Sequence, residues 1–187
     1  MKKAEYTYLL AFMNISRAIN SSLELQEVLK RIVRSTCETT GSKGCTLMLL
    51  EEEGERLEVK ASYGLSDRYV RKGPLSADKS ISDTLRGKPV IIEDATSDPR
   101  VQYPLEAEEE RIASIVSLPV TLGERVIGVL RLYTSAPCRF TQDDIDFLSA
   151  VAMQSGLAID NAKVHEHVKL DCDKRVLQSS STGGVSR

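Results

Sequence analysis

Apolar residues recur along the chain with two different periods, which divide it into helical and extended segments. In residues 1–20 and again in residues 28–33 the apolar positions are three to four residues apart, which predicts two helices. Ser21 and Glu24 form a capping-box pattern at the start of the second helix, and Gly41 is suited to end it.

From residue 44 the period changes to that of an extended chain. A short apolar run at 45–50 and an alternating segment at 57–61 flank a turn rich in Glu, which predicts a β-hairpin. Residues 64–80 have no regular period. A short helix that ends at Gly87 and a short strand at 89–92 are expected to follow.

Two longer apolar stretches then predict a second hairpin. Residues 114–121 and 126–134 carry apolar side chains on both faces, so helices are expected to cover both sides of this sheet. Thr141 is expected to cap a long helix that runs to about Leu177. The Ser/Gly-rich residues 179–187 are predicted to be disordered. The fold class is therefore α+β, with a sheet and helices in layers.

Composition and charge narrow the class of protein. The 187 residues fit one domain and can bury a core without disulfides or metals. A formal net charge of −2 lacks the basic excess of a dedicated nucleic-acid binder, and no apolar run approaches the ~18 residues of a membrane span. Four cysteines without a C-x-x-C pair, and no signal-peptide cleavage site, favour reduced thiols and a cytoplasmic location.

Three stretches carry a resemblance to a known family. They are GKPVIIED with DPR at 87–94 and 98–100, SLPV with VIGVLRLY at 117–120 and 126–133, and FTQDDIDFL with AIDNA at 140–148 and 158–162. Each pattern is weak alone, but in this order and spacing they resemble the GAF family of sensory domains over residues 5–165.

The resemblance implies a central antiparallel β-sheet of five or six strands with helices on both faces and a long C-terminal helix. It also implies a ligand pocket between the sheet and the middle segment, residues 64–113, with a signal relayed through the terminal helices. A single GAF-like domain is expected over 1–168, followed by a helical extension and tail over 169–187. The terminal helices, 4–20 and 143–170, are expected to join two copies as a homodimer.

Motifs for catalysis are missing from the chain. It contains no G-x-G-x-x-G, P-loop, G-x-S-x-G or H-E-x-x-H pattern, and its only histidines, His165 and His167, follow the domain core. A core serine or cysteine therefore lacks a neighbouring imidazole base. The two histidines point about 200° apart on a helix, which is poor spacing for metal ligands. His165 with the following Glu also resembles the start of a histidine-kinase phosphorylation motif, without its proline; a solvated helix end is the favoured interpretation.

The chain departs from the ligand-specific branches of the GAF family. The free methionine sulfoxide reductase branch has cysteines around the pocket, whereas residues 64–113 contain none. Bilin-binding relatives need a cysteine beside a histidine and haem-binding relatives an axial histidine, and the core has neither. Of the cyclic-nucleotide signature, only the spacing of Phe140 and Asp144 is similar. We therefore expect no cofactor, no metal and no enzymatic activity.

Pocket residues are sought in the middle segment and on the strand that follows it. Ser80 at a helix start offers free backbone N–H groups, and Arg100 and Tyr103 lie in a long loop. Ser114 and Ser117 interrupt an apolar strand on opposite faces, so only one of them can face a pocket. The plainer alternatives are a helix cap, a surface ion pair of Arg100 with an Asp, and hydrogen bonds within the sheet. The ligand-binding candidates are Ser80, Ile81, Asp94, Arg100, Tyr103, Ser114 and Val116.

The function predicted from these observations is that of a non-catalytic sensor, which binds an unidentified small molecule and relays its presence in signal transduction. A ligand-free dimerisation or interaction module is the alternative, and an enzyme of the free methionine sulfoxide reductase type is a third interpretation. The signalling partner would be a kinase or a transcription regulator, on another chain or in a longer regulator of which this is a part. Neither a nucleic acid nor a membrane is expected as a partner.

Overall fold

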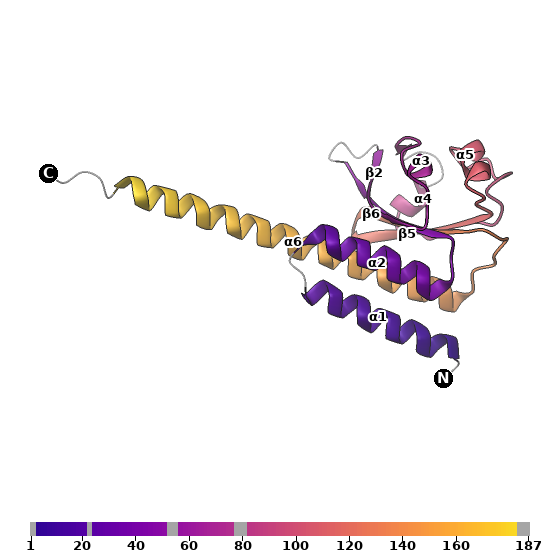
Figure 1. Ribbon diagram of the computed structural model, residues 1–187, viewed down its shortest axis with the longest axis horizontal. Helices are drawn as coiled ribbons and strands as arrows, with labels where there is room; N and C mark the ends of the chain where they lie inside the picture. Colours follow the sequence, from indigo (N-terminus) through magenta and orange to yellow (C-terminus); the bar gives the residue numbers. More distant parts are fainter. Residues whose placement is uncertain (1–2, 22–23, 52–55, 77–81, 183–187) are drawn as a thin grey trace.

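The computed structural model describes residues 3–21, 24–51, 56–76 and 82–182. The helices and strands in chain order are α1 (Lys3–Ser21), α2 (Leu25–Thr40), β1 (Gly44–Leu50), β2 (Arg56–Tyr63), α3 (Asp67–Val70), β3 (Leu75–Ser76), α4 (Ser82–Leu85), β4 (Val90–Ile92), α5 (Pro104–Glu109), β5 (Ser114–Leu122), β6 (Arg125–Thr134) and α6 (Gln142–Thr182). The predicted α+β class, with an antiparallel sheet covered by helices on both faces, is confirmed (Figure 1).

The strands form one six-stranded sheet in the order β3–β2–β1–β6–β5–β4, with every neighbouring pair antiparallel. The hairpins β1–β2 and β5–β6 are the two that the hydrophobic pattern predicts. They meet in the middle of the sheet, where β1 pairs with β6. This pairing brings together residues that lie 79 to 89 positions apart in the chain, with Thr46 opposite Arg131.

Helices α2 and α6 cover one face of the sheet, and α1 packs on them from the side away from the sheet (Figure 1). The main core lies between this helix layer and the inward side chains of the strands. Its fully buried members include Leu29 and Ile32 of α2, Val116 and Leu118 of β5, and Leu148 of α6.

The opposite face lies beneath the middle segment, which carries α3, α4 and α5 (Figure 1). A second cluster of buried side chains gathers there, around Tyr69, Ile92, Ile115 and Tyr133. The periodicity does not predict α5. This helix has Pro104 in its first turn, where the fixed backbone angle of proline favours a helix start.

Capping agrees with the sequence pattern at two helix ends and differs at one. Thr141 Oγ1 accepts from the backbone N–H of Asp144, and the Asp144 carboxylate accepts from the N–H of Thr141, a reciprocal cap at the start of α6. Gly41 ends α2 in the left-handed conformation, as predicted. The predicted capping box at Ser21 is wrong, because helix α1 continues through Ser21. The N-cap of α2 is Glu24, whose side chain makes no capping hydrogen bond.

Helix α6 is 41 residues long and projects well beyond the body of the domain (Figure 1). It continues past Leu177, where the sequence pattern places its end, to Thr182. None of the helices in the described part of the chain is long and apolar enough to span a membrane. The domain boundary at residue 168 stays a prediction.

Candidate functional site

Buried polar side chains form a row across the sheet on the face beneath the middle segment. Arg131 of β6 stands opposite Ser117 of β5 on one side and Thr46 of β1 on the other. Their relative exposures are 3%, 0% and 2%. Because side chains alternate along a strand, Val116 and Leu118, which pack in the helix-side core, place Ser117 on the other face. We call Thr46, Arg131 and Ser117 the polar row.

Neighbouring side chains provide hydrogen-bond partners for part of the polar row. The hydroxyl groups of Thr46 and Tyr133 lie 3.2 Å apart, and the Tyr133 hydroxyl also shares a hydrogen bond with Arg131. Burial raises the pKa of Tyr133, so this hydroxyl stays neutral. Tyr69 of α3 packs edge-on against the Tyr133 ring, at 5.7 Å between centroids. An aromatic side chain of the middle segment therefore packs against the tyrosine that bonds the polar row.

Two buried hydroxyl groups on this side of the sheet lack a hydrogen-bond partner in the described part of the chain. Ser117 Oγ and Thr84 Oγ1 are fully buried and have no hydrogen-bond partner in the described part of the chain. Thr84 belongs to α4, which packs on β5 and β6 above the row. A buried hydroxyl without a partner costs about 1–3 kcal/mol, so such groups are rare in a core that serves packing alone. They make this face of the sheet the candidate functional site.

A lysine from the middle segment lies near the row. The Lys72 ammonium stands 3.6 Å from the centroid of the Tyr69 ring and donates to the Tyr69 carbonyl at 3.0 Å. The Tyr103 ring lies further off, at 5.7 Å. Burial first, and then the positive charge of Arg131, lowers the pKa of Lys72 to about 8. Glu106 and Glu110 act in the opposite direction.

Among the residues expected to bind a ligand, Tyr103 is the one that the structure brings to this region. Its hydroxyl donates to the Pro74 carbonyl at 3.0 Å, and its ring faces Lys72. Ser80 and Ile81 lie outside the described residues. The loop between β4 and α5 holds Asp94 and Arg100 at a different place.

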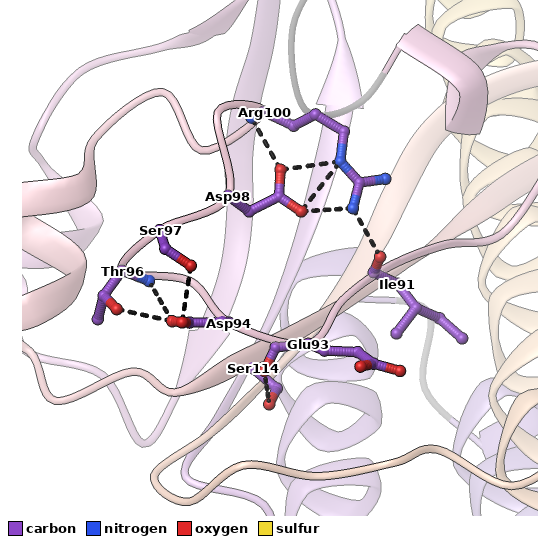
Figure 2. A network of polar contacts seen from close by, with 8 residues as sticks. All are labelled: Ile91, Glu93, Asp94, Thr96, Ser97, Asp98, Arg100 and Ser114. Carbon is purple, nitrogen blue, oxygen red and sulfur yellow. Dashed lines mark hydrogen bonds and ion pairs between the residues drawn. The ribbon is translucent and has the colours of Figure 1, made fainter.

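Asp94 is engaged by its own loop (Figure 2). Its carboxylate accepts from the backbone N–H of Thr96 at 2.9 Å and from the hydroxyls of Thr96 and Ser97. These hydrogen bonds, first that of the Thr96 hydroxyl, lower the pKa of Asp94 to about 2. Such a carboxylate shapes the turn that follows β4.

Arg100 is engaged by the same loop. Its guanidinium pairs with both carboxylate oxygens of Asp98 and donates to the Ile91 carbonyl at 3.0 Å (Figure 2). The pairing with Asp98 is the ion pair named as the plainer alternative for Arg100. Two open surface cavities, of 740 Å³ and 580 Å³, adjoin this loop and include Asp94 in their linings.

Ser114 and Val116 share the opposite face of β5 from Ser117. Ser114 Oγ donates to the Glu93 carbonyl at 2.7 Å and accepts from the Cys138 N–H at 3.0 Å. Val116 is buried in the helix-side core. The structure thus places Ser117 beneath the middle segment, whereas the hydrogen bonds of Ser114 connect the loop after β4 to the loop after β6. A role in ligand binding for the residues that the sequence singles out stays a prediction.

The signal that could have found the row is a charge within an apolar strand. Arg131 interrupts the run VIGVLRLY, and a buried arginine in a sheet needs polar neighbours. Lys72 and Thr84 carry no comparable signal, because their places above the row depend on the path of the middle segment.

None of the three cysteines whose side chains the structure describes belongs to the polar row. Cys37 and Cys45 are buried in the helix-side core, and Cys138 is half-buried in the loop after β6. Burial raises the pKa of all three thiols, which keeps them protonated and weakly nucleophilic. In the described part of the chain, no group of His, Cys, Asp and Glu is arranged to hold a metal ion.

The comparisons with known proteins agree with this architecture. The family model for the GAF domain matches residues 22–160. The chain belongs to the GAF family. The GAF domain of a phosphoenolpyruvate-protein phosphotransferase from Coxiella burnetii superposes with a TM-score of 0.78, at 20% identity, over 89% of this chain and 99% of that one.

Two other similar proteins are a regulatory protein and an enzyme. A Nif-specific regulatory protein of Herbaspirillum seropedicae is 22% identical over 94% of this chain. The chain spans only about a third of that protein's length, 34%. A free methionine-R-sulfoxide reductase from Neisseria meningitidis, solved with its substrate, has a TM-score of 0.74 at 14% identity, over 88% of this chain and 95% of that one. This likeness shows the shared fold alone.

Proposed function

We propose that this GAF domain is a non-catalytic sensor that binds a small molecule between the polar row and the middle segment. The observation that carries the proposal is the pair of buried hydroxyls, Ser117 and Thr84, that have no partner in the described part of the chain. A ligand that accepts hydrogen bonds would satisfy both groups. The free energy that these unpaired hydroxyls cost the ligand-free protein would then be recovered when the ligand binds.

The position of β5 and β6 supports a relay from this site to the helices. Ser117 and Arg131 lie on one face of these strands, while Val116 and Leu118 on the other face pack in the core shared with α6. A ligand that shifts β5 relative to β6 therefore changes the surface on which α6 rests. Ligand binding would favour one arrangement of the terminal helices over another, as a population shift.

Exposed apolar side chains on the terminal helices support a homodimer as the form that carries the signal. On α1 and α6 they are Tyr6, Leu9, Leu10, Met13, Met153, Leu157 and Val164. α1 also packs directly against α6, so both sets belong to one helix layer. A second copy of this chain would cover these side chains with the same apolar side chains of its own α1 and α6, as helices do when they pair in bundles.

The chemistry of the site supports sensing rather than catalysis. A reductase mechanism would need a thiol at the pocket, and the described cysteines lie in the helix-side core or in the loop after β6. The likeness to a regulatory protein supports a partner in signalling, such as a kinase or a transcription regulator. A ligand-free interaction module remains the competing function, and it predicts a site that nothing occupies.

Native mass spectrometry of the freshly purified chain, followed by a denatured run, tests the proposal. We expect a stoichiometric small molecule that leaves on denaturation, and we expect Ser117→Ala to carry less of it than Ser114→Ala. An apo protein that also shows no thermal stabilisation by any member of a metabolite panel would favour the interaction module.

A further inference from the structure

Two cationic side chains lie on the covered side of the sheet. Arg131 belongs to β6 and is buried. Lys72 follows α3, and its ammonium lies 3.6 Å from the centroid of the Tyr69 ring and 5.7 Å from that of Tyr103. The charge of Arg131 lowers the pKa of Lys72, second only to burial, so the two groups are within electrostatic range. Like charges repel more strongly away from bulk water, so an anion between them would be stabilised by both.

The unpartnered hydroxyls add donors to the same place. Ser117 Oγ comes from β5 and Thr84 Oγ1 from α4, and both are fully buried. With Lys72 from the loop after α3 and Arg131 from β6, four side chains with hydrogen-bond donors lie on the side of the sheet beneath the middle segment. A hydroxyl can also accept, but an ammonium and a guanidinium can only donate. The set as a whole therefore suits a ligand rich in acceptors.

The nearby acids lie on α5 and the turn that follows it. Glu110 is already engaged, with the Lys43 ammonium at 3.5 Å and the Ser66 backbone N–H at 3.1 Å. Glu106 faces Lys72 closely enough to raise its pKa, but less than Arg131 lowers it. Burial and Arg131 together lower the pKa of Lys72 despite the two acids, so an added negative charge would stabilise its ammonium.

We propose that the ligand of this site is a small anion with a carboxylate or phosphate group, held by Lys72 and Arg131 and by the hydroxyls of Ser117 and Thr84. This inference rests on the proposed function of the same site and names the chemical class of its ligand. Charge-assisted hydrogen bonds to both cations would supply the affinity. The two hydroxyls would orient the acceptor oxygens.

Isothermal titration calorimetry of the whole chain at pH 7 tests the ligand class with three probes. Succinate and inorganic phosphate carry the charge, and succinamide is the uncharged counterpart of succinate. We expect saturable binding of at least one anion, with succinamide at least about tenfold weaker, since hydrogen bonds to a charged group are stronger than those to a neutral one. Binding of phosphate alone would point to a phosphorylated ligand, and binding of succinate alone to a carboxylic acid.

Substitutions assign the binding to this site. Lys72→Met keeps the length of the side chain and removes its charge, so the affinity should fall about tenfold or more. Lys88→Met, at an exposed lysine of the turn before β4, is the matched control and should bind like the parent. Ser117→Ala should also weaken binding, which covers the case in which Lys72→Met does not fold.

The pH dependence gives a second readout. The charged groups nearest Lys72 are Arg131, Glu106 and Glu110. Lys72 loses its charge as the pH rises through about 8, whereas burial raises the pKa of Tyr69 and Tyr133 and keeps both hydroxyls neutral. The affinity for succinate should therefore fall between pH 7 and pH 9.5, and in Lys72→Met it should not.

Two results would overturn the inference. One is equal binding of succinate and succinamide, and the other is the absence of saturable heat with both anions. Neither result contradicts the proposed sensor. If native mass spectrometry recovers a neutral molecule whose binding depends on Ser117, the binding site stands and only the chemical class of its ligand changes. Failure of the sensor itself would appear as an empty site in native mass spectrometry.

Discussion

Ser114 and Ser117 lie three residues apart on β5 and point to opposite faces of the sheet. Ser114 donates to the Glu93 carbonyl and accepts from the Cys138 N–H, whereas Ser117 has no partner in the described part of the chain. Both are fully buried. Two serines in one strand thus serve different purposes, one holding loops together and the other facing the middle segment.

Ser117→Ala should therefore leave the empty protein as stable as before, or raise its free energy of unfolding by up to about 1 kcal/mol. The reason is that the substitution removes a buried hydroxyl that has lost its water without gaining a partner. Urea unfolding of the ligand-free protein measures the change. A loss above about 1 kcal/mol would mean that the Ser117 hydroxyl has a stabilising partner.

Ser114→Ala should lower the free energy of unfolding by about 1–3 kcal/mol, because it leaves a carbonyl and an N–H without their partner. The same urea experiment compares the two serines directly. Equal effects of the two substitutions would contradict the assignment of different roles.

Tyr8→Phe should lower the free energy of unfolding by about 1 kcal/mol at pH 7, since the Tyr8 hydroxyl donates to the Asp144 carboxylate between α1 and α6. Burial raises the pKa of Asp144, but hydrogen bonds from Tyr8 and Thr141 outweigh it and hold the pKa below its usual range. A lowered carboxyl pKa stabilises the fold above the unfolded value of about 3.9, and this contribution is lost as the pH falls through the folded pKa.

The difference between the parent and Tyr8→Phe should thus be present at pH 7 and shrink near pH 3. Urea unfolding at both pH values checks this. Tyr6→Phe, at an exposed position of the same helix, is the matched control and should change little. A difference that does not depend on pH would remove Asp144 from the explanation.

Leu9→Glu combined with Leu157→Glu should make the protein monomeric, because each would place a charge in the proposed contact between helix layers. Light scattering coupled to size-exclusion chromatography, at micromolar concentrations, reports the mass. Leu105→Glu is the control, because Leu105 is 71% exposed and belongs to α5, on the opposite side of the sheet from α1 and α6 (Figure 1). A parent protein that is already monomeric would contradict the homodimer.

Gly156→Ala should lower the free energy of unfolding by about 2–3 kcal/mol through overpacking. A Cβ at Gly156 would lie 2.0 Å from the Thr121 carbonyl oxygen, where α6 crosses β5. Asn161→Ala, at an exposed position of the same helix, is the control and should change stability little. Thermal unfolding of both variants measures the difference, and equal melting temperatures would contradict the close approach.

Local patterns in the sequence predict most of the fold. The 3.6-residue period marks α1, α2 and α6, and the left-handed glycine at Gly41 ends α2 as expected. The two hairpins follow from apolar strands separated by short turns. Helix α5 is missed because its six residues are too short to show a period.

Local sequence patterns predict the candidate site less well than they predict the fold. Strand alternation alone shows that Ser114 and Ser117 oppose one another, and the loop composition draws attention to Asp94 and Arg100. The loop residues are bound to their own neighbours, Thr96 and Asp98 among them. Turn-forming residues satisfy one another locally, so a cluster of them in a sequence indicates a shaped loop more often than a ligand site.

The sequence by itself determines the GAF architecture of this protein, because helix period, strand alternation and caps are properties of neighbouring residues. Only the tertiary structure decides which face of β5 lies beneath the middle segment, and so which serine faces the candidate site. The same holds for the approach of Lys72 to Arg131. Both depend on the pairing of β6 with β1 and on the path of the middle segment, which are contacts between residues far apart in the chain.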